Sequence, residues 1–261
     1  MIRLEPVAYQ RVEALYRAHD AFYPLIVAVL KGDQNGVVYA DDPVMPSQAY
    51  VEHAFGFAQI IGRSNGNFES ALQRYLLVDK QFESAKVRLY TPGLPAFLAA
   101  PENDSMRSWR QRFILDDLAF RRCLAELPAL DHRTSVERIN AGNIEEIEKQ
   151  FNVVRRFWRT PDDFIQKARA VTVLRDGVPA ALCYAAAEAD GQLEIDVLTA
   201  PEHRSLGLAK LVTAGFIEQS LDLALRPLWD CFTNNDGSMA LCRSIGFVLA
   251  RPAYAFYTIA R

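Results

Sequence analysis

The stretch from residue 193 to residue 209 constrains the fold more than any other part of this chain. Residues 193–199 read as a buried strand, a loop with one glycine at Gly207 follows, and a helix continues from there. Glycine has no Cβ, so it lets the backbone N–H groups of such a turn come close to an anion. The helix N-terminus adds unsatisfied N–H groups and the positive end of the helix dipole. The stretch therefore predicts a site for a phosphate or pyrophosphate.

Two common phosphate-binding loops do not fit this stretch. A P-loop needs Gly-Lys-Ser/Thr, but Leu208 follows the glycine here. A dinucleotide fingerprint needs two earlier glycines, and the loop has none. From the loop alone, an ordinary strand-turn-helix with one glycine in the turn stays open, because short motifs also match by chance.

A second block of residues follows in a fitting order. Pro227 to Cys231 predicts the next strand, and Asn235, Ser238 and Gly246-Phe247 come after it. Arg204 to Ala209 fits R/Q-x-x-G-x-G/A, and the later block fits N-x-x-S followed by G-F. Together the two blocks resemble the acetyl-CoA-binding motifs of the GNAT N-acetyltransferases.

The resemblance implies acetyl-CoA as the co-substrate and assigns residues to it. The backbone of Val197, Leu198 and Thr199 would pair with the pantetheine arm like an added strand. Asn235 and Ser238 would make a polar contact near the pantetheine or thiol end. The amides that would hold the pyrophosphate belong to Arg204, Ser205, Leu206, Gly207, Leu208 and Ala209.

The resemblance extends over the chain in two parts. The domain prediction is an acetyl-CoA-binding catalytic domain over residues 131–261 and an N-terminal α/β domain over residues 1–130. The fold class is α/β (α+β), with a mixed, mostly antiparallel central sheet flanked by helices in the C-terminal GNAT fold. Residues 24–50 and the E-I-D of the 193–199 strand resemble the two-part GNAT group that includes the zwittermicin A resistance acetyltransferase. The N-terminal part would suit a degenerate GNAT-like half with a substrate-side or structural role.

Local signals predict several elements. Thr160-Pro161 marks a helix start, and Asp176-Gly177 marks a hairpin turn between two strands. Residues 6–17 and 24–30 predict helices, and residues 36–40 predict a strand. Residues 247–259 predict two further strands, which we assign to the C-terminal domain.

Composition excludes several classes of function. The net charge of the 261 residues is −3, which implies no general attraction to nucleic acid. The arginines between positions 107 and 122 are expected on solvated faces. The four cysteines and four histidines show no metal-ligand spacing, so we expect no metal site and reduced thiols. Without a signal-like segment or a membrane span, the predicted location is cytoplasmic. A homodimer is left open.

Glu194 and Asp196 are the candidate general bases. They are two residues apart on a strand, so both point to one face. A neighbouring like charge raises the pKa of one carboxyl group, which suits proton abstraction near neutral pH. The common base position of the family lies one residue earlier, at Leu193, and a strand bulge would repair that offset. A solvent-facing pair or a structural ion pair is the alternative.

The general acid departs from the common family pattern. The position that often carries a tyrosine, four residues before Gly-Phe, holds Cys242. Cys242 or Tyr254 could donate the proton, Tyr257 is a further candidate, and protonation by solvent is the alternative.

The resemblance implies an acyl-CoA-dependent N-acyltransferase that moves an acetyl group to the primary amine of a small molecule. Direct attack in a ternary complex is the expected mechanism. Two alternatives stay open: a non-catalytic CoA-binding sensor or partner-binding module, and a protein N-acetyltransferase.

Overall fold

The computed structural model describes residues 1–19 and 23–261, and every predicted site residue lies within these ranges. Contacts divide the chain into two compact units. The first unit comprises Met1–Arg110 and Tyr254–Arg261, and the second comprises Gln111–Ala253. The predicted boundary at 130/131 therefore falls inside the second unit, and the last strand of the chain belongs to the first.

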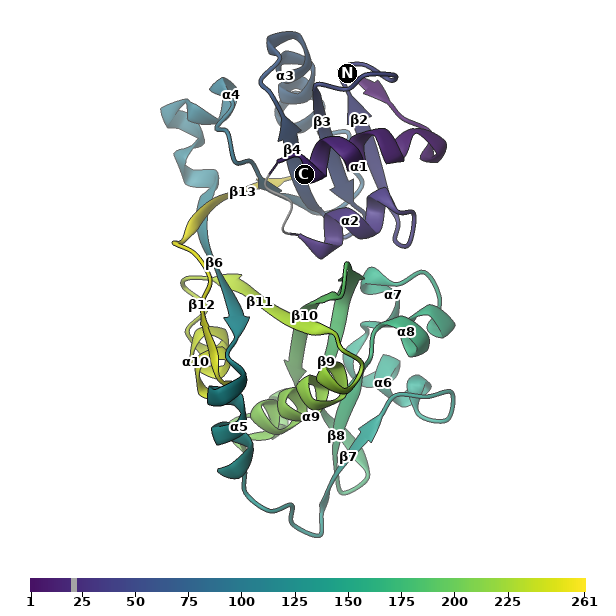
Figure 1. The fold of residues 1–261 in the computed structure, drawn as a ribbon, viewed down its shortest axis with the longest axis vertical. Helices are drawn as coiled ribbons and strands as arrows, with labels where there is room; N and C mark the ends of the chain where they lie inside the picture. Colours follow the sequence, from purple (N-terminus) through teal and green to yellow (C-terminus); the bar gives the residue numbers. More distant parts are fainter. Residues whose placement is uncertain (20–22) are drawn as a thin grey trace. The chain divides into compact units, whose positions relative to one another are not determined.

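The first unit is a mixed α/β unit in which helices cover a sheet with the strand order β1-β2-β3-β4-β5-β13-β6. All of these pairs are antiparallel except β4–β5, which is parallel. In Figure 1, α1 and α2 lie across strands β2 to β4. Its strands are β1 (Ile2–Arg3), β2 (Gly36–Ala40), β3 (Gln48–His53), β4 (Phe57–Gly62), β5 (Lys86–Tyr90), the start of β6 (Arg107–Leu115) and β13 (Tyr254–Ala260). Its helices are η1 (Pro6–Ala8), α1 (Tyr9–Arg17), α2 (Pro24–Leu30), α3 (Gly66–Gln73), η2 (Arg74–Val78), α4 (Ala96–Ala99) and η3 (Pro101–Met106).

The second unit has the strand order β6-β11-β10-β9-β8-β7, with β12 paired to β6. Strands β10 and β11 are parallel, and the pairs from β7 to β10 are antiparallel. Its strands are the end of β6, β7 (Thr134–Arg138), β8 (Val171–Arg175), β9 (Val178–Ala189), β10 (Gln192–Thr199), β11 (Arg226–Phe232) and β12 (Phe247–Leu249). Its helices are α5 (Asp117–Ala125), α6 (Ile144–Phe151), α7 (Val154–Phe157), α8 (Pro161–Lys167), η4 (Pro201–His203), α9 (Leu208–Asp222) and α10 (Asp236–Ile245).

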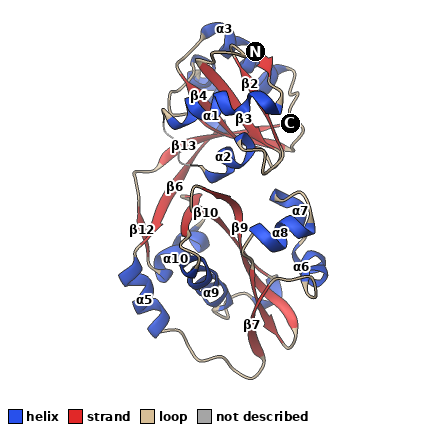
Figure 2. Ribbon diagram, turned by 45° about the vertical axis from the view of Figure 1, so that its right-hand side comes forward, coloured by secondary structure: helices blue, strands red, loops and turns tan. Residues whose placement is uncertain are grey.

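Helices cover both faces of the second sheet (Figure 2). Cys183 on β9 packs in one apolar cluster with residues of α9, such as Val212 and Phe216. Its neighbour Tyr184 packs its ring against Phe157 of α7 and Phe164 of α8 instead. Successive side chains of a strand point to opposite faces, so α9 covers one face and α7 and α8 cover the other.

The local signals in the second unit are confirmed. Thr160 caps α8, because its Oγ1 accepts a hydrogen bond from the N–H of Asp163 at 3.1 Å, and Pro161 occupies the first helical position. Asp176 and Gly177 have φ values of 52° and 79°. A two-residue turn with both φ values positive matches the right-handed twist of the strands it joins, so this hairpin forms as the sequence predicts.

The expectation of solvated arginines between positions 107 and 122 is wrong for two of them. Arg110 and Arg112 are buried, at 7% and 3% exposure. Arg110 packs over the rings of Phe57 and Phe256. Both residues lie on β6, so their side chains follow the alternation of a strand rather than an exposed helix surface.

A buried histidine in the first unit makes stability depend on pH. His53 accepts a hydrogen bond from the N–H of Phe55 at 2.9 Å through Nδ1, and its Nε2 lies 3.1 Å from Oε1 of Gln34. Burial lowers the pKa of His53 from 6.5 to about 4. In the unfolded chain the His53 side chain therefore binds a proton below pH 6.5. In the folded chain it binds this proton only when the pH falls to about 4.

We expect the free energy of unfolding to fall by about 3 kcal/mol from this group as the pH drops from 6.5 to 4. Urea unfolding across this pH range measures the effect. In the His53→Gln variant, this contribution to the change of unfolding free energy with pH should disappear. Replacement of the exposed His132 should leave it unchanged. Parallel wild-type and His53→Gln profiles would contradict the assignment.

Candidate functional site

The parallel strands β10 and β11 pair over only three residues each. Gln192 to Glu194 lie beside Arg226 to Leu228, and beyond them β10 continues to Thr199 without β11 as its partner. Val197, Leu198 and Thr199 lie on this part of β10, and all three are half-buried. An unpaired strand edge can hydrogen-bond an extended ligand as an added strand would. The residues predicted to meet the pantetheine arm thus lie on such an edge.

The predicted pyrophosphate loop leads from this edge into α9. Ser205 and Gly207 have positive φ values of 62° and 78°, so the chain turns sharply before the helix. Gly207 occupies the N-cap position, and no side chain caps the helix. A Cβ added at Gly207 would meet no atom within 4 Å, so the glycine is required by backbone conformation and not by crowding from neighbours.

The N-terminus of α9 therefore carries bare donors. Within the described ranges, the backbone N–H groups of Gly207, Leu208 and Ala209 make no hydrogen bond to the protein. Arg204, Ser205, Leu206 and Gly207 are exposed, and Lys210 is half-buried. Unsatisfied N–H groups, the positive end of the helix dipole and two nearby cationic residues together fit an anion such as a pyrophosphate.

Asn235 and Ser238 form the start of α10, after β11. The Asn235 Oδ1 accepts a hydrogen bond from the Ser238 N–H at 3.1 Å, which caps the helix. Ser238 Oγ in turn accepts a hydrogen bond from Nε1 of the buried Trp229 at 3.0 Å. Asn235 thus caps α10, and Ser238 holds the indole N–H of Trp229.

Glu194 and Asp196 lie on one face of β10, away from α9, but in different surroundings. Glu194 is 6% exposed, and its Oε2 lies 3.0 Å from Nη1 of Arg112 on β6. The Nε of the same guanidinium lies 3.1 Å from Oδ2 of Asp230 on β11. Arg112 thus joins two buried carboxylates across the sheet, which matches the structural ion pair that the sequence left open for Glu194.

Asp196 reaches solvent and has a different set of partners. Its side chain is 32% exposed. Its Oδ2 accepts a hydrogen bond from the Tyr184 hydroxyl at 2.6 Å and from Nη1 of Arg156 at 3.2 Å. Burial and the neighbouring Asp196 charge raise the pKa of Tyr184 well above its usual value, so this hydroxyl stays a donor at neutral pH. Tyr184 and Arg156 hold the Asp196 carboxylate in place, and sequence reasoning found neither of them.

The strand bulge lies next to these carboxylates. The register between β9 and β10 shifts between Glu194 and Ile195, and the extra residue is on β9. The bulge therefore does not change which β10 side chains point to each face of the sheet. Leu193 is fully buried in the apolar cluster under α9.

Cys242 and Tyr254 lie in separate units. Cys242 is fully buried in the second unit, and its Sγ–H donates to the Met239 carbonyl at 3.5 Å. Burial raises its pKa to about 12, so the thiol keeps its proton at neutral pH. Tyr254 belongs to the first unit, where its hydroxyl pairs with that of Tyr23. Tyr257, also in the first unit, is buried.

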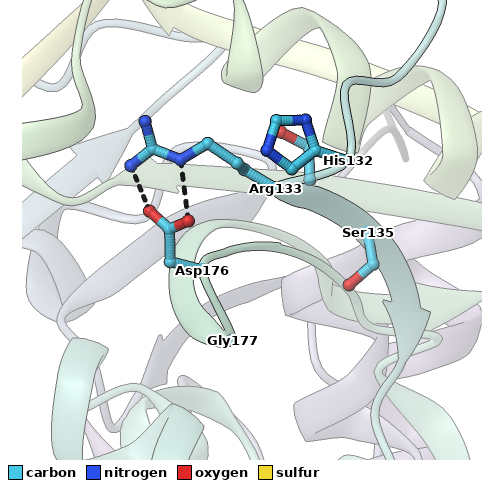
Figure 3. Close-up of a pocket in the computed structure, with 6 residues that line it drawn as sticks. His132, Arg133, Ser135, Asp176 and Gly177 are labelled. Carbon is cyan, nitrogen blue, oxygen red and sulfur yellow. Dashed lines mark hydrogen bonds and ion pairs between the residues drawn. The ribbon is translucent and has the colours of Figure 1, made fainter.

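A surface hollow also lies at the turn between β8 and β9 (Figure 3). Arg133 donates from Nε to Oδ1 of Asp176 at 2.7 Å, and the pair bridges the hollow beside Gly177. None of the predicted site residues lines it. Among the described residues, no group of three or more His, Cys, Asp and Glu side chains is arranged to hold a metal, and no helix is long and apolar enough to cross a membrane.

Known proteins resemble this chain over almost its whole length. The chain is 24% identical to the uncharacterized N-acetyltransferase YdfB of Bacillus subtilis over 251 residues, which is 92% of each chain. It superposes on a GCN5-related N-acetyltransferase-like protein from Streptococcus suis with a TM-score of 0.72 and 20% identity, covering 98% of this chain and 99% of the other. A tandem GNAT protein from the clavulanic acid biosynthesis pathway superposes with a TM-score of 0.66 and 15% identity, over 99% and 97% of the two chains.

The family assignment rests on most of the chain. The model of the GNAT acetyltransferase family matches residues 17–257, which include the open edge of β10, the loop and the bare N-terminus of α9. This match and the shared fold confirm the resemblance drawn from the two sequence blocks, and the chain belongs to the GNAT acetyltransferase family.

Proposed function

We propose that this chain transfers an acetyl group from acetyl-CoA to the primary amine of a small molecule. One observation carries the proposal: residues 200–207, which include η4, join the open edge of β10 to the bare N-terminus of α9. The N–H groups of Gly207, Leu208 and Ala209 would bind the pyrophosphate, together with the rest of the 204–209 loop. The backbone of residues 197–199 would bind the pantetheine arm, and Asn235 and Ser238 lie at the start of the next helix.

Asp196 is our candidate for the group that accepts the proton of the amine. Acetyl-CoA supplies the thioester carbonyl that the amine attacks. A C–N bond forms, the C–S bond breaks, and the CoA thiol leaves with a proton. Asp196 is partly exposed, whereas Glu194 is buried beside Arg112. A positioned carboxylate that reaches solvent can bind an amine and take its proton, either directly or through one water.

Solvent is our candidate source of the proton for the leaving thiol. The high pKa of Cys242 makes it a poor acid near neutral pH. Tyr254 is hydrogen-bonded to Tyr23 within the first unit. We therefore give both residues packing roles.

The acceptor in this proposal is a small cationic amine. Asp196 offers negative charge, which suits an ammonium group before deprotonation. A CoA-binding sensor would need the loop but not Asp196, so substitution of Asp196 distinguishes that alternative. A protein N-acetyltransferase would acetylate peptides in preference to small amines in a direct competition assay.

A glutamate at Gly207 should strongly weaken acetyl-CoA binding. The new carboxylate would face the pyrophosphate, and juxtaposed like charges cost several kcal/mol, so we expect affinity to fall on the order of 100-fold. Isothermal titration of the Gly207→Glu variant with acetyl-CoA measures the loss.

Gly191→Glu is the matched control for this substitution. Gly191 has φ +74° and, like Gly207, open space around a new Cβ. Both variants should therefore carry the same backbone strain, about 1–2 kcal/mol, while only Gly207→Glu loses binding. Equal acetyl-CoA affinity in both variants, or no binding by the wild type, would overturn the proposed cofactor site.

A further inference from the structure

The first unit repeats the strand-loop-helix-strand arrangement of the second. Strand β4 leads through a short loop into α3, and β5 returns parallel to β4. Residues 57–59 of β4 pair with residues 88–90 of β5, and residues 60–62 run on without β5 as a partner. Strands β10 and β11 pair and separate in the same way, so α3 occupies the topological position of α9.

The start of α3 has the opposite chemistry to the start of α9. Asn65 caps α3, because its Oδ1 accepts a hydrogen bond from the Phe68 N–H at 3.3 Å. The Asn65 side chain also donates to Asp41 Oδ2 at 3.0 Å, and Glu69 lies in the first turn. Burial raises the pKa of Asp41, but hydrogen bonds from Ser47, Gln48 and Asn65 outweigh it and lower the pKa to about 2. A capped helix start with two acidic side chains disfavours an anion such as a pyrophosphate.

A cavity of about 220 Å³ lies where β4 and β5 separate. Its apolar lining includes Ile60 from β4 and Leu94 and Pro95 from the segment after β5. Its polar lining includes Gln48, Glu69 and His19, and the Nδ1 of His19 lies 2.8 Å from the Leu15 carbonyl oxygen. The cavity is therefore largely apolar and carries one carboxylate.

Glu69 is the one acidic group among the described residues that line this cavity. It is 9% exposed, and its Oε1 accepts hydrogen bonds from Gln48 Nε2 at 2.9 Å and Ser64 Oγ at 2.8 Å. Both donors are neutral, and among the described residues no lysine, arginine or histidine forms an ion pair with Glu69, although His19 lines the same cavity. A largely buried carboxylate without a cationic partner favours a ligand that brings the positive charge.

We propose that the cavity of the first unit binds a small ligand through a primary ammonium or guanidinium group against Glu69. The apolar part of the ligand packs on Ile60 and Leu94. This site is separate from the proposed acetyl-CoA site, and the two inferences do not depend on each other.

Matched amines and alcohols test this site. The probes are benzylamine and butylamine, each compared with the neutral benzyl alcohol or 1-butanol of the same shape. Binding is measured by titration calorimetry and located by the methyl NMR signals of Ile60 and Ile61. We expect each amine to bind at least tenfold more tightly than its alcohol, with shifts at both isoleucines.

Three variants separate a binding role of Glu69 from a purely structural one. Glu69→Gln keeps an acceptor for Gln48 and Ser64 but removes the charge, so the preference for amines should disappear. Leu94→Phe narrows the cavity at a half-exposed position and should weaken both amines without affecting folding. Glu83→Gln, at an exposed position of the same unit, should behave as wild type.

Several results would overturn the proposal. Amine and alcohol could bind equally well, or Glu69→Gln could keep the preference for amines. The methyl NMR signals of Ile60 and Ile61 could fail to shift. The chain could also bind a second acetyl-CoA at a site that Leu94→Phe removes. Amine binding that persists in Gly207→Glu and Asp196→Asn supports it. A wild-type chain that binds benzylamine at Glu69 but no acetyl-CoA would overturn the proposed function and leave this site standing.

Discussion

The Asp196→Asn variant should lose about 10²- to 10⁴-fold in kcat, the usual contribution of a positioned general base. Asparagine has the same shape and still accepts a hydrogen bond from Tyr184, but it cannot take a proton from the amine. Free-thiol release with an amine that the wild type acetylates measures kcat. Acetyl-CoA affinity should stay within about twofold, because the predicted cofactor contacts lie elsewhere.

Two further variants make this test specific. Tyr184→Phe removes the 2.6 Å hydrogen bond to Asp196 and should lower kcat by a smaller factor, about tenfold. Glu188→Gln is the matched control, because Glu188 is also a partly exposed carboxylate of the β9–β10 pair and also contacts an arginine, Arg169, at 3.1 Å. Near wild-type turnover in Asp196→Asn would show that this carboxylate takes no part in the chemistry. Wild-type acetyl-CoA binding without turnover on any amine would favour the sensor.

The Arg112→Met variant should lose about 3–5 kcal/mol of unfolding free energy, the usual result of breaking a buried ion pair from one side. Glu194 and Asp230 would remain with side chains 8% and 0% exposed and without the guanidinium between them. For a unit of this size the loss corresponds to roughly 10 °C in Tm. Urea unfolding and thermal melting measure it.

A combined variant distinguishes the loss of the ionic attraction to Arg112 from the cost of leaving two buried carboxylates without a positive charge. Arg112→Met together with Glu194→Gln and Asp230→Asn removes all three charges, so much of the lost stability should return. Arg226→Met is the matched control, because Arg226 pairs with Asp117 at 3.0 Å with both side chains about half exposed. It should cost less than about 1 kcal/mol. If Arg112→Met also costs less than this, the three residues do not form a structural ion network.

The turn before α9 was predictable because its signals are short-range. Gly207 needs a positive φ, and the residues around it form a strand, a turn and a helix in immediate succession. The turn at Asp176-Gly177 and the helix start at Thr160-Pro161 have the same character. Backbone sterics and local hydrogen bonds decide such features within a few residues.

The partners of the carboxylates were not predictable, because they come from distant segments. Arg112 lies 82 positions before Glu194, and Arg156 lies 40 positions before Asp196. The alternation along β10 predicts that both carboxylates share a face, but it does not distinguish them. Only the neighbouring strand and helix make one a buried ion-pair member and leave the other partly exposed.

The domain boundary was not predictable for the same reason, because it depends on which distant strands pair. The sequence predicts two strands within residues 247–259, and both form. Strand β12 pairs with β6 in the second unit, whereas β13 pairs with β5 and β6 in the first. Local sequence thus determined these elements, the glycine turn before α9 and the family of this protein. Tertiary structure alone decided which strands pair and which charges meet, because those contacts join residues far apart in the chain and depend on packing that no local pattern encodes.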